Sequence, residues 1–159
     1  MAAGDITLVN SFPQQCANGV FNDLTETTIS VVLIDNSKTA VVTDTRFNYS
    51  AINDPAYGNF IGDVLNISFY QQLSNSVIEE VSAGKFKFSA NPVTLTQYAG
   101  AQATLNAYQA IICKAGPIGF RNTNLVGFVD LGGAWDMKAA SLTITWHASG
   151  IFDCERVRP

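Results

Sequence analysis

The sequence feature that most constrains the fold is a recurring alternation of apolar and polar residues with a period of two. In the stretch SLTITWHASGIFDC (Ser141 to Cys154), apolar residues alternate with threonines and a histidine until Gly150 interrupts the pattern. Successive side chains of a β-strand point to opposite faces, so such alternation predicts half-buried strands. No stretch sustains the 3.6-residue period of an amphipathic helix. The chain is therefore predicted to be all-β, an antiparallel β-sandwich or barrel-like fold.

Several other segments follow the same pattern. Strands are predicted at residues 27–36, 63–73, 104–116, 125–133 and 141–154, with a shorter apolar run at 39–45. In residues 77–98, Phe86 and Phe88 alternate with Lys85 and Lys87, and Pro92 is expected to interrupt the segment. Gly127 is expected to introduce a kink or bulge into the strand at 125–133. Residues 104–116 are rich in Ala, Leu and Gln and also allow a helix, but their alternation favours a strand. Gly116-Pro117 ends that element in either case.

A length of 159 residues fits one domain, with an N-terminal arm or short helix within residues 1–24 and a β-sandwich over residues 25–157. The short helix is expected within residues 13–24. Residues 47–63 indicate a long loop, and the aromatic side chains that recur there suggest that packing orders it. The role of the longer aromatic segment Phe47–Tyr70 stays open.

Charge excludes some classes of function. The net charge is −4, the pI is about 4.7, and the nine Lys and Arg residues are scattered, so nucleic-acid binding is not expected. No apolar run reaches the roughly 18 residues that a membrane-spanning helix requires, and the start MAAGDITLVN has no secretion-signal pattern. Charged residues make up 14%, against about 25% in an average soluble domain. Such a surface suits a protein that packs against other subunits.

Cysteine spacing predicts no metal site. Cys16, Cys113 and Cys154 are far apart and form no C-x-x-C pair, and the single histidine leaves the usual zinc ligand set incomplete. Without a signal peptide the chain is made in a reducing compartment, which favours three thiols, although a disulfide within the chain or between subunits stays open. No cofactor is expected, because no phosphate-binding or dinucleotide-binding motif is present.

Catalytic residues are not apparent either, and the chain is not expected to be an enzyme. A Ser-His-Asp mechanism would require His147, which the alternation places on the outward face of its strand, and no G-x-S-x-G motif is present. Glu79 and Glu80 are adjacent, so in a strand they point to opposite faces rather than at one substrate. The other acidic residues form no recognisable frame. The prediction is therefore no catalytic, cofactor-binding or metal-binding residues.

A ligand-binding module is an alternative from another class. Aromatic side chains at five positions could line the cup of a β-barrel that binds a small ligand or a carbohydrate: Phe60, Phe69, Tyr70, Trp135 and Trp146. For Trp146, which lies on an alternating strand, a place in the hydrophobic core is the preferred interpretation.

Four blocks in order carry a resemblance to a known group of proteins. They are FNDLTETTISVVLIDNSKT, VSAGKFKFSANPVTLT, LNAYQAIICKAG and LVGFVDLGGAWDMKAASLTITWHASGIFDC, which together run from Phe21 to Cys154. This order resembles that of small β-rich virion proteins encoded by tailed bacteriophages. The last block is also loosely similar to the C-terminal strand of lambda-type head decoration proteins. The segment Phe47–Tyr70 departs from the pattern.

The resemblance implies an all-β structural protein of the phage virion and no catalytic residues. The first expectation is a capsid decoration (cement) protein that binds the outside of the head, acts as a homo-oligomer and bridges subunits of the major capsid protein. A tail, collar or fibre-associated structural protein is the alternative within the same class. The expected location is the virion, after synthesis in the cytoplasm of the bacterial host.

Overall fold

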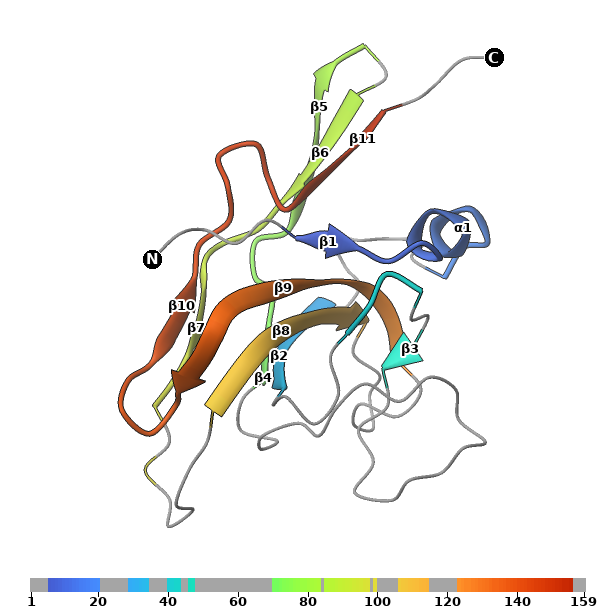
Figure 1. Cartoon of the computed structure of the whole chain (residues 1–159). Helices are drawn as coiled ribbons and strands as arrows, with labels where there is room; N and C mark the ends of the chain where they lie inside the picture. Colours follow the sequence, from blue (N-terminus) through green and yellow to red (C-terminus); the bar gives the residue numbers. More distant parts are fainter. Residues whose placement is uncertain are drawn as a thin grey trace.

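The computed structural model describes residues 6–20, 29–34, 40–43, 46–47, 70–83, 85–97, 99, 106–114 and 123–155. Eleven strands and one short helix lie in these ranges, and the predicted all-β fold is confirmed (Figure 1). The elements are β1 (Thr7–Leu8), α1 (Phe12–Ala17), β2 (Ile29–Ile34), β3 (Arg46–Phe47), β4 (Tyr70–Gln72), β5 (Val77–Ser82), β6 (Lys85–Ser89), β7 (Val93–Leu95), β8 (Asn106–Lys114), β9 (Thr123–Asp136), β10 (Leu142–Ile144) and β11 (Phe152–Glu155).

The largest sheet has the strand order β1-β9-β8-β2-β4, and β3 also pairs with β9. All pairings in it are antiparallel. All six residues of β2 are buried, and none is more than 2% exposed. Because alternate residues of a strand face opposite sides, the sheet is covered on both faces at β2. Within the described strands the sheet stays open and does not close into a barrel.

A second structural unit is a long antiparallel ribbon. One side of the ribbon is β6 followed by β7, and the other side is β10 followed by β11; β7 pairs with β10 and β6 pairs with β11. Five positions separate Phe88 from Val93, whereas eight separate their partners Phe152 and Ile144. The C-terminal side therefore carries three extra residues, which the turn around residues 147–150 absorbs.

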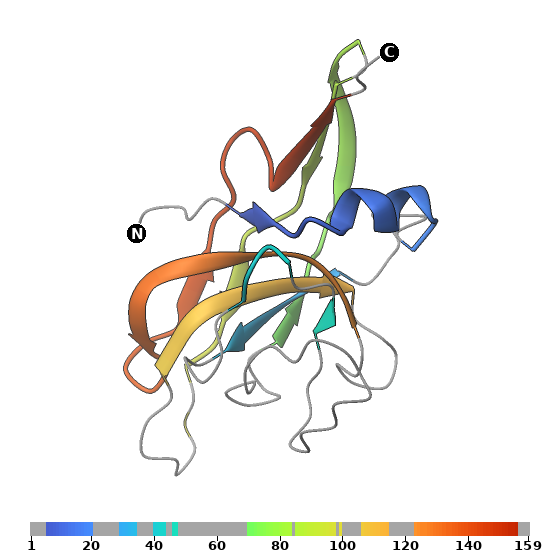
Figure 2. The same cartoon turned by 45° about the vertical axis from the view of Figure 1, so that its right-hand side comes forward.

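The outer end of this ribbon projects away from the large sheet in both views (Figures 1 and 2). There β5 joins it, and the sheet order is β11-β6-β5. We call these three strands the arm. Its base is fixed to the body by aromatic packing: the rings of Phe88 and Phe152 stack at 5.0 Å, and Phe12 of α1 meets Phe152 edge-on at 5.1 Å.

Buried apolar residues form one continuous cluster from Val9 to Phe152, with contributions from the helix, the large sheet and the ribbon. A buried hydrogen bond adds a long-range connection to it, because the amide of Ala40 donates to Gln109 Oε1 at 2.7 Å. Lys114 Nζ donates to the carbonyl of Val20 at 2.6 Å and connects β8 to the segment after the helix. Within the described ranges, no helix is long and apolar enough to cross a bilayer.

Most of the predicted elements are confirmed where the structure describes them. The short helix begins one residue before the predicted range, with Pro13 in its first turn. Residues 106–114 form strand β8, not a helix. Strand β4 is the end of the segment predicted at 63–73, and Pro92 lies in the gap between β6 and β7.

The predicted kink at Gly127 is also confirmed. The pairing of β8 with β9 is irregular next to it, because Ile112 pairs with Gly127 and Cys113 pairs with Leu125. A Cβ atom at position 127 would lie 2.5 Å from the carbonyl oxygen of Thr7, so glycine lets β1 approach β9 closely. The long loop, apart from the backbone of Phe47 and Tyr70 in β3 and β4, lies outside the described residues.

Candidate functional site

The segment 141–154 is divided between two sheets and is not one continuous strand. Leu142 and Ile144 of β10 are buried and Thr143 is exposed, as the alternation predicts. A turn follows, in which the amide of Gly150 donates to the carbonyl of His147 at 2.8 Å. After the turn the chain pairs with β6: Ile151 N donates to Phe88 O at 2.7 Å, and β11 begins at Phe152. The expected turn or bulge at Gly150 is confirmed.

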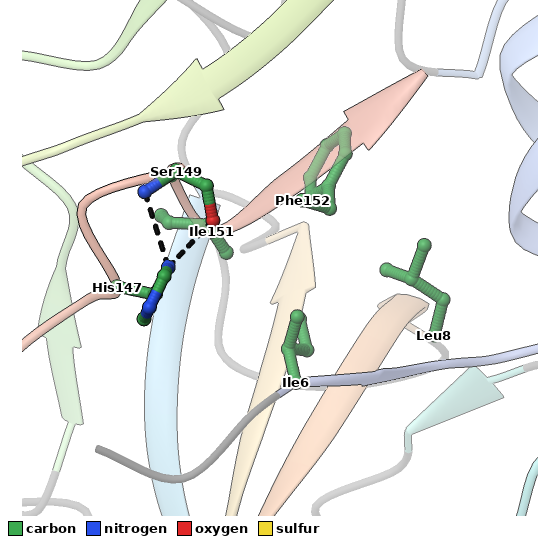
Figure 3. A pocket seen from close by; sticks show the side chains of 7 residues that line it. Ile6, Leu8, His147, Ser149, Ile151 and Phe152 are labelled. Carbon is green, nitrogen blue, oxygen red and sulfur yellow. Dashed lines mark hydrogen bonds between the residues drawn. The ribbon is translucent and has the colours of Figure 1, made fainter. Parts of the chain in front are cut away.

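A hollow of about 260 Å³ lies beside this turn (Figure 3). Its walls are formed by β1 and the residue before it, by the turn, and by the start of β11. The lining residues are Ile6, Leu8, His147, Ser149, Gly150, Ile151 and Phe152. Most of these side chains are apolar, and the imidazole and the hydroxyl supply its polar side chains. The only histidine in the sequence therefore lies at a concave surface.

The polar pair in the hollow is a local contact of the turn. Ser149 donates its amide hydrogen to His147 Nδ1 at 3.2 Å, and Ser149 Oγ lies 2.6 Å from the same nitrogen. Since Nδ1 accepts the amide hydrogen, the hydroxyl of Ser149 is the donor in the second contact. Both side chains are exposed.

Nucleophilic catalysis requires a serine, a base and a third group that orients the base. In the described ranges, both hydrogen bonds of the His147 ring go to Ser149, and no third group holds Nε2. In the same ranges, no three His, Cys, Asp or Glu side chains gather as a metal site would require. Within the described residues, the pair is a local contact of the turn.

The arm is the more distinctive surface feature. Six large apolar side chains are exposed in the described ranges, and four of them belong to the arm: Val77, Ile78, Val81 and Phe86, each 39–50% exposed. All six residues of β5 are exposed. Phe86 and Phe88 share one face of β6, but Phe88 is 2% exposed at the base of the arm, while Phe86 lies beyond the core and is 39% exposed. Exposed apolar side chains that cluster in this way mark interaction surfaces.

Two glutamates lie at the centre of β5. Glu79 pairs across the arm with Lys87 of β6, with 2.9 Å between the carboxylate and Lys87 Nζ. Glu80 lies opposite Phe86. They point to opposite faces of the arm, as their adjacency predicts, and each face carries exposed apolar neighbours. In the described part of the chain β5 pairs with β6 alone, so β5 is an edge strand.

The tryptophans proposed for a ligand cup do not line one in the described structure. Trp135 and Trp146 are half-buried and pack against the hydrophobic cluster. Trp146 Nε1 donates to the carbonyl of Asn91 at 3.0 Å and bridges the two sides of the ribbon where its pairing is interrupted. The expected core role of Trp146 therefore holds in part, because it packs at the core's margin. Phe60, Phe69 and the side chain of Tyr70 lie outside the described residues.

Two of the three cysteines can be placed. Cys113 is buried in β8, Cys16 is half-buried in α1, and both are present as thiols. Burial in an apolar environment raises the pKa of the Cys113 thiol far above its ordinary value. Such a thiol is inert. The side chain of Cys154 is outside the described residues.

Comparisons of the chain with known protein families, with curated proteins and with solved structures found no match. Function is therefore inferred from the molecule itself. Its most informative feature is the arm, which sequence patterns alone did not identify. The available signal was the pair of short alternating segments VIEEVS and KFKFS, which carry more large apolar residues than a small hairpin can bury.

Proposed function

We propose that this chain is a structural protein of a tailed-bacteriophage virion and that it binds the outside of the head as a decoration protein. The observation that carries the proposal is the projecting arm, with four exposed large apolar side chains around an edge strand. The order of the four sequence blocks supports the choice of a virion protein. The low fraction of charged residues agrees with a surface that lies against neighbours.

The mechanism follows from the burial of surface between subunits. Fully burying one large apolar side chain contributes about 1.5–3 kcal/mol. The four arm residues are roughly half exposed, so covering them contributes about 3–6 kcal/mol before the cost of association. One such contact is weak. Homo-oligomers that bridge capsid subunits would repeat it over the whole shell, and multiplicity would then supply the strength.

The test is the composition of purified particles. Quantitative mass spectrometry of gradient-purified virions should detect this chain at hundreds of copies, in a fixed ratio to the major capsid protein. Copies in a small multiple of six or twelve would move the assignment to the tail or collar. Absence from particles that carry all other structural proteins would refute the proposal.

A double variant tests whether the arm is required for binding to the particle. Replacing Val77 and Ile78 by serine removes two exposed apolar side chains from β5 without opening a cavity, because both are more than 40% exposed. The replaced chain should fold as before and should be lost from particles. Replacement of the exposed Val41 and Val42, which lie away from the arm, is the matched control and should leave particle binding in place.

A further inference from the structure

We infer that the outer edge of β5 accepts, by strand addition, an extended segment of another protein that carries Lys or Arg side chains. The inference deepens the proposed function, on which it rests for the identity of the partner as a virion protein. Strand addition uses main-chain hydrogen bonds for affinity and alternate side chains for specificity. Each requirement has a counterpart on the arm.

The first requirement is an accessible edge. Six consecutive residues, Val77–Ser82, are all exposed, and β6 is their one strand neighbour in the described ranges. Edge strands in native proteins are usually short, covered or twisted away, because their open N–H and C=O groups pair with other chains. β5 is as long as an average strand. Its only irregularity is the shift in pairing between Glu80 and Ser82 near the tip.

The second consideration is which strand can lie beside β5. Two copies that pair edge to edge are related by a two-fold axis perpendicular to the sheet, and that axis sets one residue opposite its own copy. The two registers with the greatest overlap centre on Glu79 or Glu80, the middle residues of β5. Either register sets two identical carboxylates directly opposite each other, which is destabilising. The edge therefore disfavours a second copy of itself.

The same residues favour a basic partner. On its inner side Glu79 already pairs with Lys87, so a Lys or Arg on the incoming strand would extend this pair into a cross-strand ladder of alternating charge. Glu80 presents a carboxylate on the other face. Two apolar residues next to the basic pair on the incoming strand would cover Val77 and Ile78, which are 43% and 47% exposed. The fitting occupant is thus an extended segment in which two adjacent basic residues, one for each face of the arm, are flanked by pairs of β-branched residues.

A designed peptide tests the inference without any particle. The probe is the fluorescein-labelled peptide Val-Val-Lys-Lys-Val-Val-Lys-Lys, and its binding to the purified full chain is followed by fluorescence anisotropy. Two control peptides carry Glu in place of each Lys, or N-methyl groups on alternate amides that remove edge hydrogen bonds. The Lys peptide should bind at least tenfold more tightly than either control. Its affinity should fall as salt is added.

A charge reversal in the chain locates the binding. Glu80→Lys should weaken the Lys peptide about fivefold, the effect of a cross-strand ion pair. Glu80→Lys raises the net charge by two. The matched control raises it equally at exposed positions of the body, as the double variant Thr96→Lys with Thr145→Lys, and should change the affinity less than twofold. Circular dichroism confirms that each variant is folded. Hydrogen exchange of the Val77–Ser82 amides should slow when the peptide is bound.

Each other outcome overturns the inference. Equal binding of the N-methylated peptide would exclude strand addition, and equal binding of the Glu peptide would exclude a basic partner. If raising the concentration of the chain without peptide slowed hydrogen exchange of the β5 amides, the edge would instead bind a second copy of the chain. The proposed function is tested separately. If the chain is absent from virions, the proposed function is refuted. If the chain is present in virions but its β5 amides exchange hydrogen as fast as in the isolated protein, the inference alone is refuted.

Discussion

Replacing Gly150 by alanine tests whether the turn between β10 and β11 determines how the arm is attached. Gly150 has φ +100°, a backbone conformation that residues with a side chain rarely adopt. A Cβ atom there would lie 2.6 Å from the carbonyl oxygen of Phe88 and 2.5 Å from Lys87 Cγ. The lysine side chain can move, but the carbonyl belongs to β6. The turn must therefore move away from the strand.

The expected cost has two parts. The backbone conformation contributes about 1–3 kcal/mol of strain for a residue other than glycine. Moving the turn also weakens the hydrogen bond from Ile151 N to Phe88 O, which contributes about 1 kcal/mol. Gly150→Ala should then lower the free energy of unfolding by about 2–4 kcal/mol. For a domain of this size, about 1 kcal/mol corresponds to roughly 2–4 °C in Tm.

Gly132 supplies the matched control. It also has a positive φ, +73°, but a Cβ atom there would meet nothing within 4 Å. Gly132→Ala should therefore cost the conformational part alone, about 1–2 kcal/mol. Urea denaturation followed by circular dichroism gives both values from the midpoints at constant m. If Gly150→Ala were no more costly than Gly132→Ala, the close approach to Phe88 would have no energetic weight and the reasoning would be refuted.

Other perturbations test separate parts of the structure. Gln109→Ala should destabilise the chain by about 1–3 kcal/mol in urea denaturation, since it leaves the buried amide of Ala40 without its acceptor; an unchanged midpoint would show that the hydrogen bond is unimportant. Ser30→Ala should be neutral or stabilising by the same measurement, because the buried Ser30 hydroxyl has no hydrogen-bond partner within the described structure. Native stability should fall as the pH rises above roughly 8.5, because the unfolded chain then releases the Cys113 proton while the raised native pKa retains it. That group contributes at most about 1.4 kcal/mol per pH unit, and the slope should diminish in Cys113→Ala; an identical slope would contradict the buried thiol. His147→Ala should change the free energy of unfolding by less than about 0.5 kcal/mol, since the side chain is exposed; a larger loss would show that the turn contact stabilises the fold.

The strands were predictable where the pattern of apolar residues has one physical cause. β8 contains residues that also favour helices, yet its alternation indicated a strand, because burial between β2 and β9 outweighs intrinsic propensity. Gly127 was predictable as a bulge because glycine within an apolar strand has few other uses. The segment 141–154 showed its turn through Gly150. What local pattern could not show is that β10 and β11 belong to different sheets, since that depends on partners about fifty to seventy positions earlier.

The arm illustrates the same limit at the candidate site. Phe86 and Phe88 have the same local pattern, so the sequence predicts the same burial for both. Their difference arises because the body ends between them, and only tertiary structure determines where that happens. The sequence did predict that Glu79 and Glu80 face opposite sides of the sheet, from adjacency alone. It contained no sign that β5 would be an edge, because strand order in a sheet is not a local property.

The complete burial of β2 also has a consequence for synthesis of the protein. Its sequence, ISVVLI, carries no charge and no proline, and such segments associate readily with one another when exposed. Strand β8, which pairs with the whole length of β2, begins roughly seventy residues after β2 ends. A ribosome takes about 4–14 s to add these residues. During that interval β2 emerges without its partner. Slower initiation, lower temperature or a bound chaperone should therefore raise the soluble yield.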